Sequence, residues 1–109
     1  MKPRTNIKKF TDIPNVGKAT EGDFLLLGYK KPCELIDQDP YQLYSRLCEI
    51  TNQKHDPCVI DVFIAAIRFM QGEEAQKWWF YTDERKRYLA SLGVGAITSL
   101  KNTGLRNPS

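Results

Sequence analysis

The chain has 109 residues, of which 41% are apolar and 27% are charged, and its formal net charge is +3 at pH 7. These values are typical of one folded domain and argue against a disordered chain, while the longest apolar stretch, Val62 to Met70, is too short to cross a bilayer. Residues 1–6 include basic side chains but no apolar segment follows them, so we expect no secretory signal and a cytoplasmic protein without membrane contact.

Two amphipathic helices separated by a tight turn are predicted at the N-terminus. Apolar residues recur at a three-residue step over 7–13 and predict a short helix that must end at Pro14. A second helix is predicted from about Gly17 to Leu27, because its apolar side chains share one face and Gly28 suits the left-handed position after a helix.

Two helices are predicted in the acidic middle of the chain. Lys31–Ile36 indicates one or two helical turns that open with a proline at the first position. Asp39 is followed by another proline and predicts a capped helix that continues to about Thr51.

The most apolar helix is predicted after Asp56, which repeats the aspartate–proline signal. It should span Cys58–Gln71, and because it is apolar on nearly every side it belongs in the centre of the fold. Asp61 and Arg68 lie seven residues apart, so we expect them to form one exposed edge.

An aromatic segment, Trp78 to Tyr81, precedes a last helix predicted over Asp83–Leu92 with Thr82 as its cap. We expect Trp78 and Trp79 mainly to cover the central helix and the basic residues 85–87 to be solvated. The alternative is a stacking platform beside a basic strip, as in proteins that bind single-stranded nucleic acid.

The fold class is therefore all-α, because no segment shows the alternation of a strand. We expect a compact bundle of four to six short helices in one domain over residues 1–100, with a disordered tail over 101–109.

Leu92–Ala96 repeats the small-Val-Gly core of the first turn and offers a second hairpin as an alternative, although Gly-Val-Gly is also an ordinary helix stop.

The turn between the first two helices has residues suited to an anion. Gly17 lets a ligand approach the backbone closely, and the N-terminus of the next helix presents unpaired N–H groups. Lys18 adds a cation, Val16 would pack between the helices, and Asn15 tolerates left-handed geometry. A phosphate would fit this turn.

Ile13 to Lys18 resembles the hairpin of helix-hairpin-helix DNA-binding proteins, which hold the duplex backbone without reading sequence. Further stretches in the same order make residues 7–87 resemble the bacterial pathogenicity locus (mitomycin-resistance-like) family: Leu-Leu-Gly, Asp-Pro-Tyr-Gln-Leu-Tyr, His-Asp-Pro-Cys-Val-Ile-Asp-Val-Phe and Trp-Trp-Phe-Tyr-Thr-Asp-Glu-Arg-Lys. The resemblance implies a helix-hairpin-helix (SAM-like) motif at about residues 5–28 and a link to DNA damage or drug tolerance. It names no reaction.

We therefore expect a non-enzymatic protein that binds duplex DNA without sequence preference and needs no cofactor or metal. Charge supports this function, because residues 1–31 carry seven Lys or Arg against three Asp or Glu. The expected nucleic-acid-binding residues are Asn15, Val16, Gly17 and Lys18, with Lys8, Lys9, Lys30 and Lys31 as electrostatic support. Glu21 and the acidic middle of the chain favour the alternative, a protein-interaction or self-association module that no longer binds DNA.

Two chemical alternatives involve the residues around His55. Cys48, His55 and Cys58 are all residue types that bind zinc, but their spacing differs from that of common ligand pairs, and Asp56 is better explained as a cap. Cys58 with His55 as its base could also form a nucleophile at a helix start. We favour the interpretation that all three cysteines, Cys33, Cys48 and Cys58, are core residues.

Overall fold

The computed structural model describes the backbone of residues 2–99 and the surroundings of the side chains of residues 2–92. Every regular element in this range is helical, which confirms the all-α prediction. The elements are η1 (Phe10–Asp12), α1 (Lys18–Leu26), η2 (Pro32–Leu35), α2 (Pro40–Thr51), α3 (Cys58–Met70), η3 (Trp78–Tyr81) and α4 (Thr82–Ser99), where η marks a short 3-10 helix. Among the described residues, no helix is long and apolar enough to cross a membrane.

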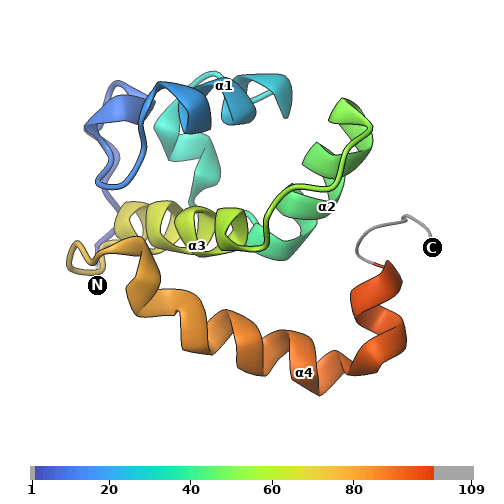
Figure 1. The fold of residues 1–109 in the computed structure, drawn as a ribbon. Helices are drawn as coiled ribbons and strands as arrows, with labels where there is room; N and C mark the ends of the chain where they lie inside the picture. The colour runs from blue at the N-terminus through green and yellow to red at the C-terminus, as the bar shows by residue number, and fades with distance from the viewer. Residues whose placement is uncertain (1, 100–109) are drawn as a thin grey trace.

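Helix α3 lies in the middle of the molecule, with α1 above it and α4 below it in Figure 1. Its buried residues include Phe63, Ile64 and Met70, each no more than 1% exposed. A chain of aromatic rings links it to the N-terminal elements, because the Phe24 centroid lies 5.3 Å from that of Phe63 and 5.2 Å from that of Phe10. The prediction that this apolar helix forms the centre is confirmed.

Aspartate side chains begin the two longest core helices, as their sequence predicts. The Asp39 carboxylate accepts a hydrogen bond from the Tyr41 amide at 2.9 Å, and the Asp56 carboxylate accepts one from the Cys58 amide at 2.9 Å. Such bonds satisfy an amide that has no partner within its own helix. Helix α3 is followed by Gly72, whose φ of +108° is a left-handed conformation that suits glycine.

The N-terminal segment differs from the prediction, because only Phe10–Asp12 forms a helical turn and residue 9 is extended. The reason is a set of long-range bonds. The Arg4 amide donates to the Met70 carbonyl at 2.8 Å, and the Arg4 guanidinium donates to the carbonyls of Phe69 and, at 2.9 Å, Glu73. These contacts hold the segment extended along the end of α3, so of the two helices expected around the turn only the second, α1, is a full helix.

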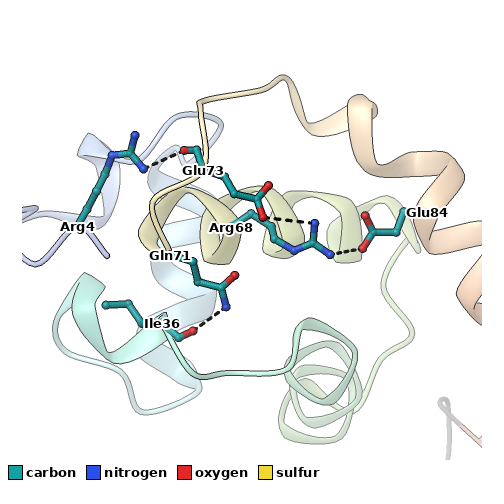
Figure 2. Close-up of polar contacts among 6 residues, drawn as sticks. All are labelled: Arg4, Ile36, Arg68, Gln71, Glu73 and Glu84. Carbon is teal, nitrogen blue, oxygen red and sulfur yellow. Dashed lines mark hydrogen bonds and ion pairs between the residues drawn. The ribbon is translucent and has the colours of Figure 1, made fainter. Parts of the chain in front are cut away.

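Groups from four parts of the chain form polar contacts at the end of α3, and Figure 2 shows most of these contacts. Besides Arg4, the Gln71 side chain donates to the Ile36 carbonyl at 2.9 Å. Arg68 forms ion pairs with Glu84 of α4 and, at 3.8 Å, with Glu73. The side chain that was expected at an exposed edge is therefore half-buried and joins α4 to the loop after α3.

Asp61 corrects the same prediction more strongly, because its side chain is fully buried. Its carboxylate accepts hydrogen bonds from the Thr82 hydroxyl at 2.8 Å and from the Arg85 guanidinium at 3.0 Å. Arg85 was expected to be solvated, and the Thr82 hydroxyl was expected to cap α4. Both instead bind Asp61 and fix the start of α4 against α3.

Helix α4 also runs further than predicted, from Thr82 to Ser99 without a stop at Gly93. The second hairpin considered as an alternative at residues 92–96 and the helix stop at the same place are both wrong, since this backbone is helical. Glycine weakens a helix by up to about 1 kcal/mol per residue but does not forbid one. The tail expected over 101–109 lies outside the described residues.

Candidate nucleic-acid interface

The turn before α1 has the left-handed residue and the buried anchor that its sequence predicts. Asn15 has a φ of +73°, and Val16 is 6% exposed and belongs to the core. The Val16 amide, however, donates to the Ile13 carbonyl at 3.1 Å. This amide was expected to bind phosphate, but it is already used inside the turn, so Val16 shapes the turn and presents no donor.

Gly17 and Lys18 are exposed at the beginning of α1. Gly17 is the N-cap residue, with extended backbone, and no side chain caps this helix. A Cβ atom added at Gly17 would meet no atom within 4 Å. Because the first-turn amides of a helix have no acceptor within it, the N-terminus of α1 presents open donors, and the same turn also carries the carboxylate of Glu21. Gly17 and Lys18 therefore lie at an exposed, uncapped helix start, which is the geometry that the sequence predicts.

Asn15 has a role that the sequence did not indicate. Its amide nitrogen donates to the Gln76 carbonyl at 2.6 Å, and its carbonyl oxygen accepts from the Trp78 amide at 3.2 Å. The side chain therefore ties the turn to a segment about sixty residues away. Both the nitrogen and the oxygen of the Asn15 side chain are therefore used within the protein, and this side chain positions the surface.

The segment that Asn15 holds is cationic and aromatic. Lys77 is exposed and lines an open pocket with Pro14 and Asn15. Its ammonium lies 5.9 Å from the ring centroid of Trp79, which is 59% exposed. Phe80 is 63% exposed as well. We call Gly17, Lys18, Lys77, Trp79 and Phe80 the turn–aromatic surface.

The expectation that both tryptophans cover the central helix is wrong for Trp79. Trp78 is half-buried and meets the Trp79 ring edge-on, with centroids 5.4 Å apart and planes at 84°. Tyr81 is the buried member of this aromatic segment, at 3% exposure. Because Tyr81 takes the place against α3, Trp79 and Phe80 are turned to solvent.

The four supporting lysines do not join the turn in one cluster. Lys8 and Lys31 line an open pocket that contains none of residues 14–18. The backbone amides of Lys30 and Lys31 donate to the Glu34 carboxylate at 2.6 and 3.0 Å, and these bonds hold the Glu34 pKa below its ordinary value. An ionised carboxylate beside Lys30 and Lys31 weakens their attraction for phosphate. Lys9 is exposed and lines neither of these pockets.

The residues around His55 have structural partners. The His55 Nε2 atom lies 2.8 Å from the Thr51 hydroxyl. Cys48 is buried as expected and Cys58 is half-buried, but Cys33 is exposed, so its assignment to the core is wrong. Burial, followed by the neighbouring Asp56, raises the pKa of the Cys58 thiol, so a thiolate is disfavoured there. Among the described residues, no three His, Cys, Asp or Glu side chains are grouped as a metal would need.

Lys77 and the position of Trp79 beside the turn are the features of the candidate site that sequence reasoning missed, whereas an exposed aromatic ring was one of its two alternatives. The aromatic segment was visible, but its position beside the turn depends on the two Asn15 hydrogen bonds. No local pattern signals a contact between residues so far apart in the chain.

Comparisons with known proteins place these observations in a family. A family model described as pathogenicity locus matches residues 3–87. The chain is also similar to a mitomycin resistance protein, McrB, of Streptomyces lavendulae, with 39% identity over 83 residues that cover 76% of this chain and 79% of the relative. No solved structure matches the chain.

Proposed function

The chain belongs to the pathogenicity locus family, and we propose that it is a non-enzymatic protein that binds DNA without reading its sequence. In this proposal the turn before α1 acts as the hairpin of a helix-hairpin-helix motif. The observation that carries it is the uncapped and exposed start of α1 at Gly17, followed by Lys18. Open amides and a cation at a helix N-terminus are suited to a phosphate.

The surroundings of the turn support the same ligand. Asn15 brings the segment with Lys77 beside the turn, so a second cation from a distant part of the chain is added. The contacts are to phosphate rather than to base edges, and such contacts position a protein without specifying sequence. We therefore expect weak, salt-dependent binding, with a Kd on the order of 10⁻⁴–10⁻⁶ M at physiological salt.

The test is fluorescence anisotropy with labelled duplex DNA of unrelated sequences over a series of salt concentrations. The variants are Lys18→Glu and Lys77→Glu, and the matched control is Lys54→Glu, which makes the same charge change in the exposed loop between α2 and α3. We expect both test variants to weaken binding to all sequences alike and Lys18→Glu to reduce the salt slope by about one. Absence of wild-type binding at low salt, or equal loss in the control, would contradict the proposal.

The name of the S. lavendulae relative extends the proposal to drug tolerance. We infer that this chain contributes to mitomycin resistance through its contact with DNA. Survival of a bacterial host on mitomycin would be measured with the wild type, Lys18→Glu and Lys54→Glu expressed at equal levels. Protection by the wild type and the control, but not by Lys18→Glu, is the expected result. Equal protection by all three proteins would show that resistance does not depend on this turn.

A second candidate function is a protein-interaction or self-association module. The observation that favours it is the exposure of Leu25, Leu26 and Ile50, each at least 50% exposed although large and apolar. Sedimentation of the wild type and of Leu26→Glu over a range of concentrations tests this alternative. Concentration-dependent oligomers that Leu26→Glu abolishes would support it, and a monomer at all concentrations would argue against self-association.

A further inference from the structure

The exposed aromatic pair of the turn–aromatic surface is held outward by the packing of its neighbours. Tyr81 is buried, and the next residue, Thr82, donates to the buried Asp61. These inward contacts fix the rotation of η3 and turn Trp79 and Phe80 to solvent. The edge-on contact with Trp78 supports the Trp79 ring from one side, and the Lys77 ammonium lies over the ring, while Trp79 as a whole stays 59% exposed. We call the exposed rings of Trp79 and Phe80 the platform.

Charged side chains of both signs lie around this platform, and a cation lies at the Trp79 ring itself. Lys77 lies beside the Trp79 ring, and Lys86 and Arg87 are exposed on the first turns of α4. Glu73 and Glu84 share the single cation of Arg68, and Glu74 and Asp83 are exposed. The positive charge that the platform offers is therefore that of Lys77 at the Trp79 ring. An aromatic platform with an adjacent cation is complementary to a polyanion that carries flat, apolar bases.

We propose that Trp79 and Phe80 stack on unpaired bases, so that the DNA bound here is a duplex that continues into a single strand. This inference rests on the proposed function, because the start of α1 would hold the duplex backbone. Paired bases inside a duplex present no free face to a surface side chain, whereas bases of a single-stranded tail do. The Asn15 hydrogen bonds would set the position of the platform relative to the duplex.

The experiment compares three labelled DNAs: a blunt duplex, the same duplex with a short thymidine tail, and the same duplex with an abasic tail of equal length. The abasic tail has the same phosphates but no bases to stack. We expect the thymidine tail to raise the affinity of the wild type by about ten-fold over the abasic tail, the size typical of one stacked base. Trp79→Ala combined with Phe80→Ala should remove this gain and keep the affinity for the blunt duplex.

Matched variants separate stacking from folding. Ile50→Ala removes an apolar side chain of similar exposure from α2 and should keep the gain. Asn15→Gly retains a residue suited to positive φ but lacks both hydrogen bonds that hold Lys77 and the aromatic segment beside the turn. It should therefore lose the gain and also weaken blunt-duplex binding, as Lys77→Glu does. Circular dichroism and thermal melting confirm that each variant is folded.

The two proposals fail in different ways. If the wild type binds the blunt duplex but prefers the thymidine tail no more than the abasic tail, the stacking inference is overturned and the proposed function stands. If Ile50→Ala loses the gain as fully as the aromatic double variant, the platform is likewise refuted. If none of the DNAs binds at low salt, both proposals are contradicted.

Discussion

Replacing Gly17 with aspartate should stabilise the protein and at the same time weaken its binding to DNA. Gly17 is the N-cap of α1, its backbone is extended, and an added Cβ would meet no atom within 4 Å. An aspartate there could accept hydrogen bonds from the first-turn amides and place a negative charge at the positive end of the helix. The same carboxylate would occupy the position proposed for a phosphate.

The stabilisation can be estimated from three contributions. A better cap adds a few tenths of a kcal/mol, and the charge at the helix end adds about 0.3–1 kcal/mol. Loss of glycine freedom in the unfolded chain adds about 0.4–1 kcal/mol. A net gain of about 1–2 kcal/mol is therefore expected, and each kcal/mol would raise Tm by about 4–8 °C in a domain of this size.

Thermal melting and DNA anisotropy on the same samples measure the two effects. We expect at least a ten-fold loss of affinity, since a charge-assisted hydrogen bond is worth about 1.5–3 kcal/mol. Gly22→Ala is the control, because it lies inside α1 with no atom near its added Cβ and should stabilise by about 1 kcal/mol with unchanged DNA affinity. A stabilised Gly17→Asp protein that binds DNA like the wild type would refute the role of the α1 N-terminus.

Three further predictions concern the fold. Gly72→Ala should destabilise by about 1–3 kcal/mol in urea unfolding, because φ is +108° and its Cβ would clash with the Lys2 carbonyl oxygen; unchanged stability would show that this contact is absent. Asp61→Ala should cost about 3–5 kcal/mol by leaving Arg85 without its buried partner, and a loss below about 1 kcal/mol would contradict this pairing. Burial, with a smaller contribution from a nearby carboxylate, raises the pKa of Tyr41 from 10.0 to about 12, so its share of the stability is complete below pH 10 and is lost as pH rises towards 12. Tyr41→Phe should therefore reduce the alkaline loss of stability in urea titrations, and an unchanged loss would be the contrary result.

Local signals in the sequence determined most of the elements. Asp39 and Asp56 mark helix starts because an aspartate cap acts on amides only two residues ahead. The all-round apolar character of residues 58–71 placed one helix at the centre, since such a surface is stable only when other elements cover it. The left-handed backbone of Asn15 and the exposure of Gly17 could likewise be predicted from the sequence, because turn geometry depends on a few adjacent residues.

Tertiary contacts decided what the local pattern left open or indicated wrongly. The helical period of residues 7–13 was overridden by Arg4, whose bonds to the end of α3 hold the segment extended. Asp61 was expected at the surface, but Arg85 and Thr82 from α4 satisfy its carboxylate in the core. A buried charge is tolerable only with such partners, and their arrival from another helix has no signature in the sequence around Asp61.

The candidate site shows the same division. The residues of the turn before α1 are enough to predict the shape of the turn and the open amides at the start of α1. This is because a helix N-terminus depends on one short segment of the chain. The placement of Lys77 and Trp79 beside it was decided by the Asn15 side chain, which bonds to residues 76 and 78. Two hydrogen bonds across about sixty residues depend on how α3 and the loop after it pack, and only the folded chain brings these groups together.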